Sequence, residues 1–282
     1  MARLTDAGRA GIDRVLADPT FELIPLKNAR EQAAALPPGA TVSVTASPAK
    51  GLEATVELAA ELQAGGLRAI PHISARMVHD EVHLAGLLDA VAAAGIDRAF
   101  VVGGDAQDPG PFLDGLSVLQ AMEALGRLPV EVGVPCYPQG HPSIPDDTLL
   151  GALHAKARFA SYMTTQLCFD PEAITTWLAA RRAEGIALPV RIGVPGVAAI
   201  PKLLEISARI GVRDASRFVL KNSRFVGELL KSGGLYKPTK LLEQLAPLLA
   251  DPAANVIGLH VYTFNNVEAT VDWRDKALAK GR

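Results

Sequence analysis

Three polar side chains that could act as acids or hydrogen-bonding groups lie at the ends of hydrophobic runs. Glu22 lies in the apolar stretch Phe21-Glu22-Leu23-Ile24-Pro25, Asp105 ends Gly103-Gly104-Asp105, and Gln166 ends Thr164-Thr165-Gln166. An unpaired buried carboxylate costs several kcal/mol, so Glu22 needs either a partner or a raised pKa. A raised pKa would make Glu22 a candidate general acid. Three such groups at the ends of predicted strands indicate one shared site.

Hydrophobic or β-branched runs recur along the chain and alternate with amphipathic stretches. Most runs are apolar throughout, which is typical of parallel strands that are buried on both faces. The predicted strands are Thr20–Ile24, Ala40–Thr45, Arg68–Ser74, Arg98–Gly103, Val130–Tyr137, Ser161–Leu167, Val190–Pro195 and Val256–Thr263. The predicted helices between them include Leu52–Gln63, Asp80–Ala94, Asp146–Arg158, Pro171–Ala183 and Ala198–Ile210. This repeat indicates parallel strands joined by helical crossovers.

The repeat predicts an α/β fold, a single (β/α)8 TIM barrel that covers residues 1–282. The length of 282 residues suits this fold, which typically needs about 250. Met1–Pro19 predicts a short N-terminal helix, because its apolar positions have helical spacing. Arg213–Ala250 predicts two extra helical segments before the last strand, divided by Ser232-Gly233-Gly234.

The active sites of such barrels lie at the carboxyl ends of the strands. The polar residues predicted to lie there are Glu22, Thr45, His72, Asp105, Tyr137, Gln166 and Tyr262. Each also has a structural interpretation: Thr45 and Tyr262 can satisfy loop hydrogen bonds, and His72 can be a paired core histidine. Gly193-Val194-Pro195-Gly196 follows the seventh run and is interpreted as a tight turn in preference to a phosphate site.

Composition excludes several classes of protein. The net charge is −2, from 28 basic and 30 acidic side chains with no basic cluster, so no nucleic-acid partner is expected. No run approaches the roughly 18 apolar residues of a membrane span, and no secretory signal begins the chain, so a cytoplasmic protein is expected. Cys136 and Cys168 form no CxxC pair, which excludes a zinc or disulfide framework.

Other motifs for metals and nucleotides are weak or missing. His79 and His83 are four residues apart without an evident third ligand, so they are interpreted as a solvated helix face and no metal site is predicted. No Gly-x-Gly-x-x-Gly or Walker A sequence occurs, so a nicotinamide cofactor would need a site specific to the barrel.

Seven motifs, in order along nearly the whole chain, resemble those of the methylenetetrahydrofolate reductase family, whose catalytic domain is a (β/α)8 barrel. Phe21-Glu22-Leu23-Ile24-Pro25 resembles the Phe-Glu-Phe-Phe-Pro that opens the family. The other matches are Val42-Ser43-Val44-Thr45, Pro71-His72-Ile73-Ser74, Gly104-Asp105, Tyr137-Pro138-Gln139-Gly140-His141-Pro142, Thr165-Gln166 with Phe169-Asp170, and His260-Val261-Tyr262-Thr263-Phe264-Asn265.

The resemblance implies reduction of 5,10-methylenetetrahydrofolate to 5-methyltetrahydrofolate in one-carbon metabolism, with Glu22 as the general acid. It implies that Asp105 binds the pterin and that Gln166 is its amide partner. Phe264 and Ile200 match positions that pack against the folate or the nicotinamide. The positions that contact the cofactor in the family are matched by Thr45, His72, Tyr137 and His141.

The departures from the family pattern cluster where the family holds FAD. Gly103 stands in place of an Arg, Gly151 in place of an Asn, and Lys156-Ala157-Arg158-Phe159-Ala160-Ser161 in place of Lys-x-Asp-Ala-Gly-Ala. A hydrogen bond to a charged group contributes about 1.5 to 3 kcal/mol, so losing two would weaken FAD binding by roughly two to four orders of magnitude. Lys156 or Arg158 could supply the missing charge.

The hypothesis is therefore a reductase that transfers hydride directly from NADH or NADPH to the folate, without tightly bound FAD. One alternative is an FAD-dependent reductase of the same family, and another is a non-catalytic barrel that binds folate or regulates a partner. The Arg that usually meets the folate tail is replaced by Asn266. Candidates to replace it are Lys221, Arg224 and Lys237.

Overall fold

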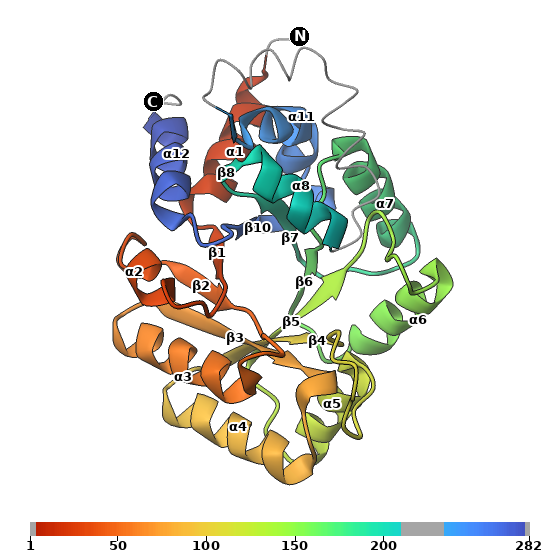
Figure 1. Cartoon of the computed structure of the whole chain (residues 1–282). Coiled ribbons are helices and arrows are strands. Elements are labelled where there is room, and N and C mark those ends of the chain that lie inside the picture. Colours follow the sequence, from red (N-terminus) through yellow and green to blue (C-terminus); the bar gives the residue numbers. More distant parts are fainter. Residues whose placement is uncertain (1–3, 210–233, 280–282) are drawn as a thin grey trace.

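The chain forms a closed barrel of parallel strands surrounded by helices (Figure 1), as predicted. A computed structural model describes residues 4–209 and 234–279. Around the ring the strand order is β1-β10-β7-β6-β5-β4-β3-β2, so the last barrel strand closes on the first. The strands are β1 (Thr20–Leu23), β2 (Thr41–Val44), β3 (Arg68–Ser74), β4 (Arg98–Val102), β5 (Glu131–Cys136), β6 (Tyr162–Thr165), β7 (Val190–Pro195) and β10 (Val256–Tyr262).

Helices connect successive barrel strands and cover the outside of the ring (Figure 1). They are α1 (Asp6–Ala17), α2 (Ala29–Ala33), α3 (Gly51–Ala64), α4 (Glu81–Ala93), α5 (Gly115–Ala124), α6 (Asp146–Lys156), α7 (Pro171–Ala183), α8 (Ile200–Arg209), α11 (Thr239–Ala250) and α12 (Val267–Ala279), with short 3-10 turns at Ala75–Met77 and Pro252–Ala254. The described helices include none that is long and apolar enough to cross a membrane.

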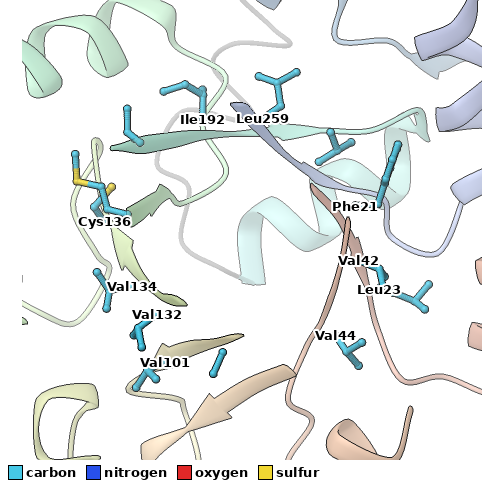
Figure 2. Close-up of a cluster of buried hydrophobic side chains, with 14 of the residues drawn as sticks. Phe21, Leu23, Val42, Val44, Val101, Val132, Val134, Cys136, Ile192 and Leu259 are labelled. Carbon is cyan, nitrogen blue, oxygen red and sulfur yellow. The ribbon is translucent and has the colours of Figure 1, made fainter. Parts of the chain in front are cut away.

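The two faces of each barrel strand carry different side chains. Phe21 and Leu23 on β1 belong to the large buried apolar core, which also includes Leu245 of α11. Figure 2 shows part of this core, with Phe21 and Leu23 labelled. The Arg274 guanidinium of α12 lies 5.9 Å from the Phe21 ring, so this face of β1 is turned towards the helices. Because side chains alternate along a strand, Glu22 points to the other face, into the barrel.

The predicted N-terminal helix is confirmed as α1, which packs against α11. A Cβ added to Gly11 would lie 2.8 Å from the carbonyl carbon of Leu249, so only glycine allows this close approach. Arg14 donates hydrogen bonds to the carbonyl oxygens of Leu249 (2.9 Å) and Val256 (2.7 Å). These bonds satisfy carbonyls at the end of α11 and the start of β10.

The region before the last strand differs in one respect from the prediction. A helix was predicted from Ala198, but Ala198 and Ala199 form the short strand β8 (Ala198–Ala199), which pairs antiparallel with β9 (Leu235–Tyr236). The helix α8 therefore begins at Ile200. Of the two extra helical segments, the second is α11, and the first falls in residues 210–233, outside the described residues.

Candidate active site

Glu22 has a partner inside the barrel. Its Oε2 lies 3.1 Å from Nε2 of His260 on β10, the strand that closes the ring beside β1. The Glu22 side chain is 13% exposed and the His260 side chain 3%. A carboxylate in this apolar stretch needs either a partner or a raised pKa, and the structure provides the partner. The pair lies at the carboxyl end of β1.

His72 lies in the middle of β3 and is buried in the barrel interior. Its Nε2 is 2.7 Å from the Ser43 hydroxyl on β2, and its ring centroid is 4.8 Å from that of Phe100 on β4. Burial, with a smaller contribution from the nearby His260, lowers the pKa of His72 to about 3. His72 is therefore a neutral, paired histidine at physiological pH.

The neutral state of His72 predicts a pH-dependent contribution to stability. An unfolded histidine titrates near pH 6.5, so between about pH 6.5 and pH 3 the unfolded chain binds a proton that the folded chain does not. Folding is therefore opposed increasingly as the pH falls through this window. We expect His72→Gln to lose about 2 kcal/mol less stability than the wild type between about pH 7.5 and pH 4.5. Urea unfolding at the two pH values measures this; parallel losses would contradict the burial of a neutral ring.

Tyr262 and Tyr137 lie at the same end of the barrel as Glu22. The Tyr262 hydroxyl donates to the carbonyl oxygen of Thr165 (3.1 Å), and its ring centroid is 4.9 Å from that of His260. Burial raises the pKa of Tyr262 well above its ordinary value, and the charges of Glu22 and Tyr137 raise it further. Burial also raises the pKa of Tyr137 to about 12. Both phenols therefore stay protonated, and the Tyr262 hydroxyl acts as a hydrogen-bond donor.

Asp105 lies on the loop that follows β4 and is exposed. The loop is held by Arg76, whose backbone N–H donates to the Gly103 carbonyl (3.0 Å) and whose Nε donates to the Ala106 carbonyl (2.8 Å). Gly104 has φ +85°, and a Cβ there would overlap the Ser74 side chain, so only glycine fits. Asp105 has no hydrogen bond or ion pair to any described residue, and its carboxylate is available to a ligand.

Gln166 follows β6 directly and is half-buried. Its Oε1 accepts from the backbone N–H of Leu167 (2.8 Å), while its Nε2 makes no hydrogen bond within the described part of the chain. In the ring order, three strand steps separate β1 from β4, two separate β4 from β6, and three separate β6 from β1. Glu22, Asp105 and Gln166 therefore surround the mouth of the barrel and do not crowd one side.

An apolar cluster borders this mouth between β6 and β10. Phe264 and Ile200 are both buried in it, so the structure brings these two predicted residues together. The other members are Leu167, Phe169, Ala198, Leu203 and Tyr236. The rings of Phe169 and Tyr236 meet edge to face, with centroids 5.8 Å apart. Such a surface suits the flat apolar face of an aromatic ligand.

The remaining predicted cofactor residues lie after β2 and β5. Thr45 is half-buried; its N–H donates to the Leu23 carbonyl (3.0 Å) and its carbonyl accepts from Thr55 (3.1 Å), so its backbone joins β1 to α3. His141 meets the Tyr137 ring edge to face at 5.6 Å. Partial burial lowers the pKa of His141. These bonds involve only the backbone of Thr45, not its side chain. The rings of Tyr137 and His141 form a second small aromatic patch.

The residues that could have held the diphosphate of FAD do not fit that role. Arg158 forms a bidentate ion pair with Glu123 of α5 (3.0 and 2.9 Å), and its guanidinium lies 3.9 Å from the Phe159 ring centroid. Lys156 is only 8% exposed, and burial lowers its pKa. A Cβ on Gly103 or Gly151 would meet no atom of residues 4–209 and 234–279 within 4 Å, so no described side chain takes the place of the missing ones.

The turn at Gly193-Val194-Pro195-Gly196 and the pair of His79 and His83 both have structural roles. Gly193 lies inside β7, and the backbone N–H groups of Gly196 and Val197 already donate to the Tyr262 carbonyl (2.9 Å) and Thr270 (3.1 Å), so they cannot also bind a phosphate. His83 bonds Glu53 (3.0 Å) and accepts from the His79 N–H (3.0 Å). Within residues 4–209 and 234–279 no group of three or more His, Cys, Asp or Glu could hold a metal ion.

The sequence alone predicts no role for His260, although His260 opens the motif His260-Val261-Tyr262-Thr263-Phe264-Asn265. The signal was available in the fold: closure of the barrel pairs β10 with β1, and the register places Thr20 opposite His260 and Glu22 opposite Tyr262. A polar residue at either inward position of the last strand must therefore lie beside Glu22.

The fold and these side chains define a (β/α)8-barrel protein with a polar site at the carboxyl ends of its strands. Residues 26–276 match the model of a family described as methylenetetrahydrofolate reductase, and the chain belongs to this family. The match includes Asp105, Gln166 and Phe264, whereas Glu22 lies just before it.

Two solved structures that resemble this chain have low sequence identity to it. A GH18 chitinase, ChiB, from Flavobacterium johnsoniae is 10% identical, with a TM-score of 0.48 over 93% of this chain and 94% of the other. A candidate phosphonomutase from Burkholderia cenocepacia is 14% identical, with a TM-score of 0.45 over 98% of this chain and 100% of the other. Likeness at this level says nothing about what this chain binds or catalyses.

Proposed function

We propose that this chain reduces 5,10-methylenetetrahydrofolate to 5-methyltetrahydrofolate by direct hydride transfer from NADH or NADPH. The observation that carries the proposal is the Glu22–His260 pair, which places a carboxyl group with a hydrogen-bonding partner at the mouth of a barrel of this family. A site that only bound folate would have no use for a partly buried acid at this position.

The proposed chemistry needs one proton and one hydride. Protonated Glu22 gives its proton to N10 of the folate as the bond from N10 to the bridging carbon breaks, which leaves an iminium at N5. The hydride from C4 of the nicotinamide then adds to that carbon and forms the methyl group, and the donor leaves as NAD(P)⁺. The Glu22 carboxylate regains a proton while His260 holds it in place.

The other residues bind and orient in this proposal. Asp105 accepts hydrogen bonds from the N–H groups of the pterin edge, and the free Nε2 of Gln166 donates to it. Phe264 and Ile200 pack against an aromatic face of folate or nicotinamide. Tyr137 and His141, whose rings meet edge to face, are proposed to contact the nicotinamide cofactor. These contacts hold hydride donor and iminium close together, which lowers the entropic part of the barrier.

Direct transfer is favoured over transfer through a flavin by the residues on the phosphate side. Arg158 is engaged by Glu123, and Gly103 and Gly151 offer no side chain. At the place where the family holds FAD, its diphosphate would need such cations or free backbone N–H groups. The proposed reaction therefore proceeds without FAD.

We expect the purified protein to oxidise NADH or NADPH in the presence of 5,10-methylenetetrahydrofolate without any flavin. The visible spectrum and the small molecules released by denaturation report bound FAD. With NADH deuterated at the transferred position, direct transfer keeps the label in the methyl group, whereas a reduced flavin can exchange it with water at N5. Stoichiometric FAD that is required for turnover, with loss of label to water, would contradict direct transfer and favour the flavoenzyme.

A further inference from the structure

Two consecutive residues with left-handed backbone follow the last barrel strand. Phe264 has φ +52° and Asn265 has φ +56°. Asparagine adopts this conformation readily, but a bulky phenylalanine rarely does, so the surrounding contacts must hold the turn in place. The turn lies between β10 and α12, next to the end of β1.

The side chains of this turn continue the pairing of β10 with β1 after the backbone ladder stops. The ladder ends with Glu22 opposite Tyr262. Beyond it, the Thr263 hydroxyl donates to the carbonyl oxygen of Glu22 at 2.5 Å. The Asn265 Oδ1 then accepts from the Ile24 N–H (2.8 Å), and its Nδ2 donates to the Ile24 carbonyl (2.9 Å). An amide side chain thus bonds both backbone groups of one residue.

These bonds are linked to one another through buried side chains. Thr263 and Asn265 are both buried, and the Asn265 N–H donates to the Thr263 hydroxyl oxygen (3.2 Å). From the opposite side, the Thr45 N–H donates to the Leu23 carbonyl (3.0 Å). The end of β1 is therefore fixed from both neighbours, although among the described residues only His260 bonds the Glu22 carboxyl group.

We propose that Asn265, acting with Thr263, is a positioning residue that sets where the Glu22 carboxyl group lies relative to the substrate. The same turn carries Phe264 into the apolar cluster, so the acid and the apolar surface have a common support. This inference rests on the proposed function, because Asn265 is given a role only through the acid. A misplacement of about 1 Å at a reacting group can lower a rate by about a hundredfold.

The chain offers a matched control at the opposite end of the same strand. Asn255 precedes β10, has φ +50°, and donates from Nδ2 to the Ala187 carbonyl (3.1 Å). It therefore shares with Asn265 the residue type, the left-handed backbone and an amide-to-carbonyl bond. It lies at the end of the barrel away from the candidate site. A general effect of removing a left-handed asparagine would appear in both variants.

We expect Asn265→Ala to lower kcat about 10- to 100-fold, with the Kd for folate changed less than about threefold. Asn255→Ala should keep wild-type kcat at a temperature where both variants are folded. Thr263→Val should lower kcat as well, and Thr263→Ser, which keeps the hydroxyl, should restore it. Wild-type kcat in Asn265→Ala, or equal losses of kcat in the two asparagine variants, would overturn the proposal.

A double-mutant cycle with Glu22→Gln separates positioning from an independent effect. If Asn265 acts through the acid, Asn265→Ala should lower single-turnover rates far less in the Glu22→Gln background than in the wild type. Losses that multiply would overturn the positioning role while leaving the acid in place. Full activity in Glu22→Gln alone would instead overturn the proposed function, and the positioning role with it.

Discussion

Glu22→Gln is expected to lower the rate of methylenetetrahydrofolate reduction by about two to four orders of magnitude, the usual contribution of a general acid. Glutamine keeps the size of the side chain and can still bond His260, but it has no acidic proton to give to N10. The bond between N10 and the bridging carbon must then break without protonation. The hydride donor would still bind, so the loss should appear in kcat and not in the KM for NADH.

Binding of folate should persist in this variant, and this outcome separates catalysis from mere binding. We expect the Kd for a stable folate to change by less than about threefold, measured by calorimetry or by fluorescence. Glu61→Gln is the matched control. Glu61 lies on α3, is exposed and pairs with Arg30 of α2, so its substitution should leave turnover unchanged. Equal loss of binding and turnover would favour the non-catalytic folate-binding alternative for the chain.

The architecture followed from the sequence because parallel strands buried on both faces have a strong signature. The run at Val190–Pro195 was predicted with the bounds that β7 has in the structure, as was that at Arg68–Ser74 for β3. Runs with a less definite end were predicted a little too long: the run to Ile24 stops at Leu23 in β1. There, the side chain of Asn265 replaces the backbone partner that a continued ladder would need.

The contacts within the site were harder to predict than the positions of its residues. The sequence placed Glu22, Asp105 and Gln166 at the ends of strands, but pairwise contacts depend on register and rotamers. Glu22 meets His260 across 238 positions of sequence, and nothing local to either residue indicates it. Similarly, the sequence alone leaves Arg158 available as a phosphate ligand. In the fold, α5 packs beside α6, and Glu123 of α5 forms an ion pair with Arg158.

Two left-handed residues at the end of β10 show the same limit for the backbone. Glycine and asparagine carry a local signal for this conformation, and Gly104 uses it beside Ser74. Phenylalanine carries the opposite signal, so Phe264 could not be predicted to adopt it. Its conformation is imposed by bonds that Thr263 and Asn265 make to β1, which exist only after the barrel has closed.

Closure of the barrel around Tyr262 leads to the second large expected effect: Gly193→Ala should destabilise the protein by about 3 kcal/mol. A Cβ at this position of β7 would lie 2.1 Å from the carbonyl oxygen of Thr165 and 2.8 Å from Cε2 of the Tyr262 ring. The carbonyl belongs to the neighbouring strand β6 and accepts the Tyr262 hydroxyl, so it cannot move without breaking that bond. The Gly193 N–H also donates to the Thr165 hydroxyl oxygen at 2.7 Å, which fixes the same contact from the other side.

Urea unfolding of Gly193→Ala and of Gly86→Ala provides the measurement and its control. Gly86 lies inside α4, is exposed, and has no atom within 4 Å of an added Cβ, so alanine there should add about 0.5 to 1 kcal/mol through helix propensity. The two substitutions are chemically identical and should have opposite signs. If Gly193→Ala unfolds within about 0.5 kcal/mol of the wild type, β6, β7 and the Tyr262 ring are not in the contact described here, since close-packed neighbours cannot absorb a methyl group at that distance.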